Sequence, residues 1–356
     1  MEKAMNTLSQ LDKSITRGLN YLEEHQYPNG EFCCYIAADE PMQGWCITES
    51  TVFATMVVPS CLLSLAERPE VDAMITKATN YLMDQMHQGG VWPVFSERHP
   101  WYSIVPYDAD SLAYASALLE ERGVCSLKQT NVPLLLANRN QQGLFYTWFV
   151  LRPGWHTNRT YWRLSTQELG RPVTSFLFWR ANECTRADID LGINTNIVYY
   201  LGDVVETQPV ITTLIQMIAT SNEDNCDKWY LNPYSIYYLL SRAYKRGVTK
   251  LEPVVKPIQE RILADVLPNG QIGKSILDTA FAVITLVNFK IDTPTIDKAI
   301  AFLLSVQEET GAWPRWLFYY GGPKRLQGWG SEEITTAFCL EALAVWKSSQ
   351  NFILAQ

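Results

Sequence analysis

A short pattern recurs along this chain and constrains its fold more than any other feature. An amphipathic segment ends in an aromatic–Leu pair, a polar turn follows, and the turn closes with Gly-x-aromatic. The clearest copies are NYLEEHQYPNGEF (20–32), NYLMDQMHQGGVWPVF (80–95) and AFLLSVQEETGAWP (301–314), and weaker copies are LLLANRNQQGLF (134–145) and ILADVLPNGQI (262–272). The gap after Gly143 has room for one degenerate copy, SNEDNCDKWY (221–230). Such periodicity is typical of proteins in which one helix pair is the repeated unit.

Each copy is followed by a second segment of helical character, with small and hydroxyl residues near its start. Six such segments are TESTVFATM (48–56), DADSLAYASALL (108–119), DIDLGINTNIVYYL (188–201), NPYSIYYLLSRAY (232–244), LDTAFAVITLV (277–287) and SEEITTAFCLEALAVW (331–346). The helices that precede them are expected to start near residues 11, 70, 127, 206, 252 and 293. We therefore predict an all-α fold, an (α/α)6 toroid of six parallel inner and six outer helices, forming a single domain over residues 1–356.

Hydrophobicity divides the two kinds of helix as this geometry requires. The second segment of each pair is apolar nearly all round, as a helix enclosed by others must be, whereas the first, such as LDKSITRGLNYLEEH, keeps its charges on one side. The segment from about 146 to 187 breaks the pattern and is rich in Trp, Arg and Pro. Long irregular segments in compact domains often act as lids, so we expect this insertion to cover one mouth of the barrel.

Composition excludes several classes of protein. The net charge is −8 and no basic run occurs, which argues against nucleic acid as a partner. No run approaches the length of a membrane span, and the N-terminus lacks the apolar core of a signal peptide, so we expect a cytoplasmic protein. The eight Cys lack CxxC spacing and the four His are scattered, which favours buried free thiols and argues against a zinc site. Contact with a membrane surface and the oligomeric state stay open.

The recurring pattern resembles a known family. Its spacing is similar to the QW repeat of the squalene cyclases and their relatives: an aromatic, Leu, three residues, Gln, a short gap, Gly, any residue and Trp. The positions of the last copy are held by Phe302, Leu303, Gln307, Gly311 and Trp313, and those of the first by Tyr21, Leu22, Gln26, Gly30 and Phe32. The chain thus resembles the terpenoid cyclase and protein prenyltransferase superfamily of α/α toroids, and the glutamine is expected to tie each helix end to its turn.

The stretch PYDADSLAYASALLEE (106–121) gains a meaning from this resemblance. Class II terpene cyclases carry Asp-x-Asp-Asp on an inner helix, and the middle Asp protonates an alkene or epoxide to start cationic ring closure. Asp108 and Asp110 match this motif, and Ser111 holds its last place. The resemblance implies that Asp110 is the catalytic acid and Asp108 its partner. The diphosphate-ionising DDxxD motif and the zinc set of the prenyltransferases are absent, so no cofactor is expected, except Mg²⁺ if the substrate is a diphosphate.

An ordinary structural role competes with this interpretation. Asp108 or Asp110 can simply cap a helix, because a carboxylate there accepts backbone N–H groups and meets the positive end of the helix. Parallel inner helices, however, bring all their N-termini to one mouth, where capping acids become a joint site. The other residues expected to bind substrate are polar or aromatic and lie on or near the inner helices: Tyr107, Tyr114, Asp190, Asn194, Tyr234, Tyr238, Asp278, Phe281, Trp329, Glu332 and Phe338. Core packing and hydrogen bonds between neighbouring helices are the alternatives for these residues.

Three functions are compatible with these features. The first is a terpene cyclase-like enzyme that cyclises or isomerises an isoprenoid or other alkene-bearing hydrophobic substrate after protonation. The second is a non-catalytic protein that binds a hydrophobic ligand or a lipidated partner in the same cavity. The third is an (α/α)6 carbohydrate-active enzyme, in which Trp platforms and paired carboxylates act on a sugar.

Overall fold

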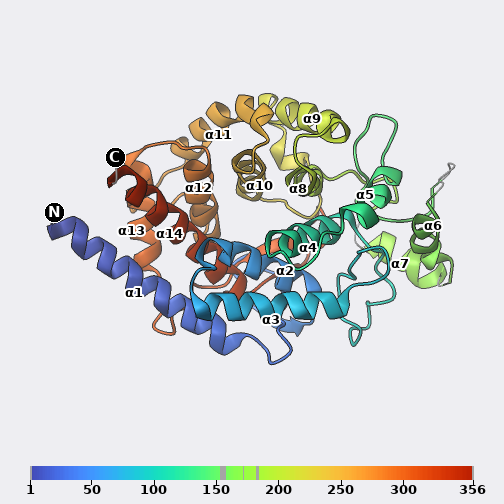
Figure 1. The fold of residues 1–356 in the computed structure, drawn as a ribbon, viewed down its shortest axis with the longest axis horizontal. Helices are drawn as coiled ribbons and strands as arrows, with labels where there is room; N and C mark the ends of the chain where they lie inside the picture. The colour runs from blue at the N-terminus through green and yellow to red at the C-terminus, as the bar shows by residue number, and fades with distance from the viewer. Residues whose placement is uncertain (1, 153–157, 171, 182–183, 355–356) are drawn as a thin grey trace.

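The computed structural model describes residues 2–152, 158–170, 172–181 and 184–354. The described chain is mostly helical and has the architecture of an α/α toroid (Figure 1). Helices occur at all six expected inner segments: α2 (Val52–Cys61), α4 (Ala109–Glu121), α8 (Leu191–Leu201), α10 (Pro233–Lys245), α12 (Ile276–Asn288) and α14 (Glu332–Leu354). The helices that precede them are α1 (Glu2–His25), α3 (Pro69–Gln85), α5 (Lys128–Ala137), α9 (Gln208–Ala219), α11 (Glu252–Ala264) and α13 (Pro294–Ser305).

The inner helices form a closed ring of contacts. Each of them packs against the next in the order α2, α4, α8, α10, α12 and α14, and α14 returns to α2. In α4 every residue from Ala109 to Leu119 is buried, whereas α3 buries only one face, through residues such as Val71, Ile75 and Leu82. The difference arises because the sequence of α4 is apolar nearly all round, whereas the sequence of α3 is amphipathic.

The glycine turns join each outer helix to the next. Gly30, Gly270 and Gly311 all have positive φ, and a Cβ on them would lie 2.2 to 2.4 Å from a backbone carbonyl oxygen of Lys77 in α3, Lys298 in α13 and Arg17 in α1, respectively. Only glycine allows both this conformation and this approach. The contact of the Gly311 turn with α1 closes the outer layer, because it joins the last copy of the pattern to the first helix.

The glutamines of the pattern tie helix ends to these turns. Gln307 Nε2 donates to the carbonyl oxygen of Gly311 at 2.7 Å and to that of Ser14 at 3.0 Å. Gln26 Nε2 does the same with the carbonyls of Gly30 and Met74, both at 3.0 Å. One side chain thus links its own turn to the adjacent outer helix.

The degenerate copy at 221–230 achieves the same link with a different group. There the turn contains a short 3₁₀ helix, η4 (Glu223–Asn225). Arg261 of α11 donates to Glu223 Oε1 at 2.6 Å and to the carbonyl oxygen of Ile218 at 2.7 Å. An ion pair therefore takes the place of the glutamine.

A small sheet was not predicted from the sequence. Its strands are β1 (Cys34–Ala37), β2 (Cys46–Glu49), β3 (Leu317–Tyr320) and β4 (Gly328–Gly330), in the antiparallel order β2-β1-β4-β3. Residues 48 and 49, expected as the start of an inner helix, belong to β2, and the helix begins at Val52. The strands are too short for a readable alternation, and their pairing is long-range: Ile36 faces Trp329. This pairing joins the loop after α1 to the loop before α14.

The insertion at 146–187 is less irregular than expected, because it contains α6 (Arg159–Ser165) and α7 (Pro172–Ala181). Residues 153–157, 171 and 182–183 of this insertion lie outside the described residues. Phe178 of α7 packs against Trp148 and Trp179, with ring centroids 5.5 and 5.1 Å apart. Trp148 and Phe178 also contact rings outside the insertion, Trp229 and Trp101, at centroid distances of 5.4 and 6.5 Å.

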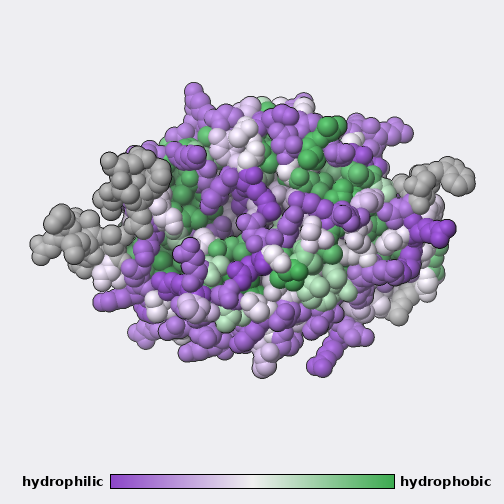
Figure 2. Space-filling model, viewed as in Figure 1, coloured by the Kyte–Doolittle hydropathy of each residue, from purple (hydrophilic) through white to green (hydrophobic). Residues whose placement is uncertain are grey.

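The surface and the cysteines of the described chain are unremarkable for a compact helical protein. Figure 2 shows a face on which hydrophilic residues dominate and hydrophobic ones lie between them. Among the described helices none is both long and apolar enough to cross a bilayer. All eight cysteines are free thiols, and most are buried.

Candidate active site

A cavity of about 200 Å³ lies at the mouth of the barrel where the inner helices begin. Three inner helices reach it with residues near their N-termini: Phe53 of α2, Asp110 of α4 and Ile193 of α8. The loops before α10 and α14 add Trp229 and Trp329. The cavity therefore lies at the mouth where the N-termini of the inner helices were expected to meet.

Each strand of the sheet contributes one residue to the cavity wall. These residues are Ile36 of β1, Glu49 of β2, Tyr319 of β3 and Trp329 of β4. Tyr319 and Trp329 are stacked, with ring centroids 5.3 Å apart. The sheet therefore shapes the site as well as joining the ends of the chain.

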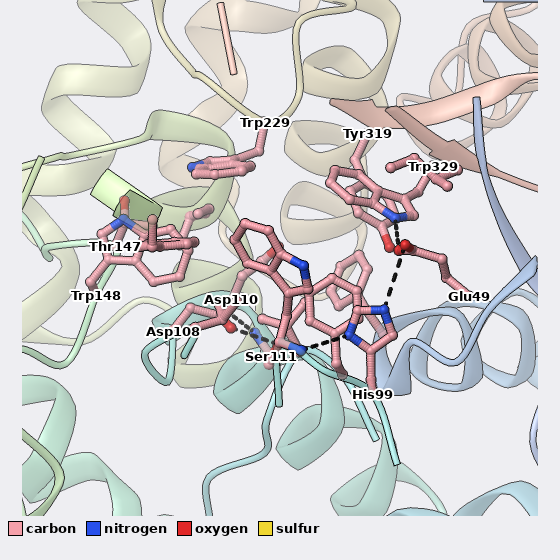
Figure 3. Close-up of a pocket in the computed structure, with 18 of the residues that line it drawn as sticks. Glu49, His99, Asp108, Asp110, Ser111, Thr147, Trp148, Trp229, Tyr319 and Trp329 are labelled. Carbon is pink, nitrogen blue, oxygen red and sulfur yellow. Dashed lines mark hydrogen bonds and ion pairs between the residues drawn. The ribbon is translucent and has the colours of Figure 1, made fainter. Parts of the chain in front are cut away.

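The rest of the lining is dominated by aromatic rings. On the side of the insertion, Trp148 meets Trp229 and Phe178 edge-on, at centroid distances of 5.4 and 5.5 Å. Further lining side chains are Val94, Phe95, His99, Trp101, Val105, Thr147, Tyr230 and Gln327. The cavity thus offers apolar ring faces on several sides and carboxylates at a few points (Figure 3).

Asp108 is the N-cap of α4. Its Oδ1 accepts the backbone N–H of Ser111 at 2.6 Å, and its Oδ2 accepts the Ser111 hydroxyl at 2.9 Å. Burial raises the pKa of Asp108 to about 6, although both hydrogen bonds oppose that rise. The capping interpretation therefore holds for Asp108, and the residue that it caps is Ser111, which stands at the last position of the motif.

Asp110 has a different environment, although it is only two residues away. It is 7% exposed and lines the cavity. Its Oδ1 accepts Asn196 Nδ2–H of α8 at 2.7 Å, and its Oδ2 accepts the hydroxyl of Tyr230 at 2.6 Å. Two neighbouring segments therefore fix its position, and it caps no backbone N–H group.

Burial raises the pKa of Asp110 to about 7, and the charge of Asp108 adds to the rise. The hydrogen bonds from Tyr230 and Asn196 oppose it. Desolvation thus outweighs the helix N-terminus, which alone would favour the ionised form. Asp110 therefore keeps its proton to a higher pH than a free aspartic acid does.

Two more buried carboxylates lie behind the cavity wall. Asp227 accepts the backbone N–H groups of Trp229 and Tyr230, both at 2.8 Å. Asp190 accepts the hydroxyl of Thr147 at 2.5 Å. Burial raises the pKa of both carboxyls, and the charge of Asp227 raises that of Asp190 further. The charge of Asp110 also raises the pKa of Asp227, so the ionisation of these buried acids is linked.

Of the residues predicted from the sequence, Asp108, Asp110 and Trp329 line the cavity. Four of the predicted aromatics lie elsewhere, in the packed barrel below or beside it. Phe281 and Phe338 are fully buried with ring centroids 4.7 Å apart, and Tyr238 packs on both. The hydroxyl of Tyr114 accepts a hydrogen bond from Arg242 at 2.7 Å. Core packing therefore accounts for these four, because inner helices present much of their surface to one another.

The predicted polar residues outside the cavity have partners in the protein. Asn194 Oδ1 accepts the N–H of Phe145 and its Nδ2 donates to the Phe145 carbonyl, both at 2.9 Å, so it fixes the preceding loop. Asp278 forms the capping box of α12 with Ser275. Glu332 pairs with Arg315 at 3.5 Å.

Two predicted tyrosines also lie outside the cavity. The hydroxyl of Tyr234 donates to Asp265 Oδ2 at 2.9 Å. Tyr107 hydrogen-bonds His87 and faces a separate pocket beside α6. Neither side chain is among those that line the main cavity.

Sequence reasoning missed most of the residues that line the cavity. Glu49, His99, Trp148, Trp229 and Tyr319 were not predicted as substrate-binding residues. All of them lie in the connections between an outer helix and the inner helix that follows it, or in the sheet formed by such connections. Their place in the cavity wall could have been predicted, because parallel inner helices require all of these connections to end at the same mouth of the barrel.

The described residues contain no group of three His, Cys, Asp or Glu side chains arranged as metal ligands would be. The buried acids are held by N–H and O–H donors of the protein instead, as in the contacts of Asp110 and Asp227.

Comparison with known proteins gives a match in structure only. No protein-family model matches the sequence, and no curated protein matches it significantly. The type II terpene cyclase MstE from Scytonema, solved with geranylgeranyl dihydroxybenzoate as substrate, is similar with a TM-score of 0.67 and 16% identity, over 96% of this chain and 98% of that one. A protein from Actinoplanes is similar with a TM-score of 0.67 and 16% identity, over 94% and 99% of the two chains.

A carbohydrate-active enzyme shares the fold more distantly. An unsaturated glucuronyl hydrolase specific for heparin is similar with a TM-score of 0.54 and 10% identity, over 96% of this chain and 98% of that one. At these identities the likeness establishes the toroid fold. The chemistry has to be argued from the site.

Proposed function

We propose that this protein is a terpene cyclase-like enzyme, in which Asp110 protonates an isoprenoid or other alkene-bearing hydrophobic substrate and so starts a cyclisation or isomerisation. The observation that carries the proposal is a buried carboxyl in an aromatic cavity, with a pKa raised to about 7. A general acid is most effective when its pKa lies near the working pH. The match with a type II terpene cyclase extends over nearly all of both chains, so one toroid of this size suffices for such an enzyme.

In the first step the Asp110 carboxyl gives its proton to one carbon of a substrate double bond. The π electrons form the new C–H bond, and the positive charge remains on the more substituted carbon. Asn196 and Tyr230 each donate a hydrogen bond to Asp110, so they stabilise the carboxylate that is left. Further double bonds of the substrate then attack the cation, and loss of a proton ends the sequence.

The aromatic lining suits the cation that this step creates. The ring faces around the cavity, including Trp148, Trp229 and Tyr319, carry negative electrostatic potential. Each ring facing a desolvated cation contributes on the order of 2 kcal/mol. The same apolar walls exclude water, which would otherwise capture the cation.

The alternatives are less well supported by the cavity. Sugars need many free hydrogen-bonding groups, but Asp108, Asp110 and Thr147 already bond to protein partners. A non-catalytic binder of a hydrophobic ligand would need the rings but not a carboxyl with a pKa near 7. A product assay separates the hypotheses.

The proposal is tested by incubating the protein with a panel of substrates and analysing the products. The panel contains free polyenes, a prenylated aromatic acid such as geranylgeranyl dihydroxybenzoate, and polyprenyl diphosphates with and without Mg²⁺. We expect cyclised or isomerised products of unchanged mass, formed equally well in the presence of EDTA unless the substrate is a diphosphate. Tight binding of polyenes without any product would support the binding protein instead.

The pH dependence of turnover follows from the pKa of Asp110. The acid must be protonated at the start of each cycle, and its pKa is raised to about 7. Turnover should therefore be greatest below about pH 7 and fall as the pH rises, approaching tenfold per pH unit. Steady-state kcat measured from pH 5.5 to 9, with the melting temperature followed in parallel, checks this. A flat profile up to pH 9 in a folded protein would contradict Asp110 as the acid.

A further inference from the structure

Glu49 is a second carboxylate in the cavity, and it lies apart from Asp108 and Asp110. It ends β2, on the wall made by the sheet, whereas Asp110 lies at the start of α4. Figure 3 shows Glu49 beside His99 and Trp329, on the other side of the drawn residues from Asp110. Glu49 takes no part in the protonation of the substrate by Asp110.

Two nitrogens of the cavity wall lie against the Glu49 carboxylate, and one of them donates a hydrogen bond to it. Trp329 Nε1–H donates to Oε2 at 2.7 Å, and His99 Nε2 lies 3.5 Å from Oε1. The backbone N–H of Trp101 donates to His99 Nδ1 at 3.1 Å, so this nitrogen is an acceptor. The proton of a neutral imidazole then resides on Nε2, which faces Glu49.

This arrangement leaves Glu49 able to accept a proton. An ionised carboxylate has about four lone-pair sites, and the Trp329 N–H occupies one of them. The Nδ1 lone pair of His99 is engaged by the backbone N–H of Trp101. Phe95 stacks on the His99 ring at a centroid distance of 4.0 Å and fixes its plane. Among the groups on this wall, Glu49 is thus the one suited to act as a base.

We propose that Glu49 is the base that ends the reaction, an inference that rests on the proposed cyclase function. A C–H bond next to the final cationic carbon breaks, its electron pair forms the C=C bond of the product, and the proton goes to Glu49. The proton gained at Glu49 and the one lost from Asp110 are exchanged with water between cycles, so the reaction is an isomerisation with no net change in mass. Separating acid and base across the cavity prevents the new cation from simply returning its proton to Asp110.

The test compares the products of Glu49→Gln with those of the unaltered protein. Gln keeps the acceptor oxygen for Trp329 but cannot take up a proton. We expect substrate consumption to fall by less than about tenfold, because Asp110 still starts the reaction. The main product should fall below about half of the total, replaced by alkene isomers and by alcohols that carry ¹⁸O from labelled water.

Matched variants separate a base from a structural role. Glu332→Gln removes a carboxylate that pairs with Arg315 outside the cavity, and its products should be unchanged. Trp329→Phe removes one N–H donor to Glu49 but keeps a ring, and it should shift the product ratio in the same direction as Glu49→Gln, but less. If either variant fails to fold, the other still gives a result, and circular dichroism identifies the failure.

The outcomes also separate this inference from the proposed function. Unchanged products from folded Glu49→Gln, with turnover still lost in Asp110→Asn, would overturn Glu49 as the base and leave the cyclase intact. No product from the unaltered protein with any substrate would overturn both. A changed product ratio with ¹⁸O-labelled alcohols supports the assignment, since a structural glutamate would not control which proton the cation loses.

Discussion

Replacing Asp110 with Asn is expected to abolish turnover, by at least about 10²-fold, without unfolding the protein. An amide has no acidic proton to give, but it has the same shape and can keep one of the hydrogen bonds from Asn196 and Tyr230. The measurement is product formation per unit time on the substrate found in the panel, with circular dichroism as the check of folding. Near-normal turnover in a folded Asp110→Asn protein would exclude Asp110 as the acid.

Two control variants sharpen this experiment. Asp278→Asn alters another buried acid at the start of an inner helix, outside the cavity, and should leave turnover unchanged. Asp108→Asn should keep the cap of α4, because Asn caps nearly as well as Asp. It also removes the charge that helps to raise the pKa of Asp110, so the decline of turnover should move to lower pH rather than disappear.

Asp110→Asn should also make the fold more stable than that of the unaltered protein above neutral pH. The folded-state pKa of Asp110, about 7, lies above its ordinary value of 3.8, so folding favours the protonated form. The stability that comes with protonation is fully present below about pH 4 and is lost as the pH rises through 7. Asp110→Asn cannot ionise and avoids this loss. At pH 8 we expect the free energy of unfolding to exceed that of the unaltered protein by on the order of 1 kcal/mol, seen as a higher melting temperature, and at pH 5 we expect a smaller difference.

The fold was readable from the sequence because its signals are local and repeated. The turns that close on Gly30, Gly270 and Gly311 mark where one helix has ended, and the apolar segment after each turn predicts a buried helix. The sheet carries no such signal. Its pairing of Ile36 with Trp329 depends on the two ends of the chain meeting, which a repeat count predicts but a local pattern does not.

The site was readable only in part, for a related reason. Asp110 stands out because a charged side chain interrupts a run of small apolar residues, and burial of that helix was predictable. Its neighbours Asn196 and Tyr230 come from segments far along the chain. The helix aromatics Phe281 and Phe338 were misleading, since a ring on an inner helix packs against the next helix more readily than it reaches the cavity. Rings that do line the cavity, such as those of Trp148 and Trp229, lie in loops, whose conformation could not be predicted from the sequence.

Closure of the ring is expected to depend on Gly311. Its φ is +96°, and a Cβ would lie 2.4 Å from the carbonyl oxygen of Arg17. Gly311→Ala adds a backbone strain of about 1–2 kcal/mol and a clash with the backbone of α1, so we expect it to destabilise the fold by about 3 kcal/mol or more. Gly247→Ala is the matched control, because Gly247 has a φ of +106° with nothing within 4 Å of its Cβ position. Urea unfolding of both variants measures the difference. Equal losses would mean that the stability of the fold does not depend on the close contact between the Gly311 turn and α1.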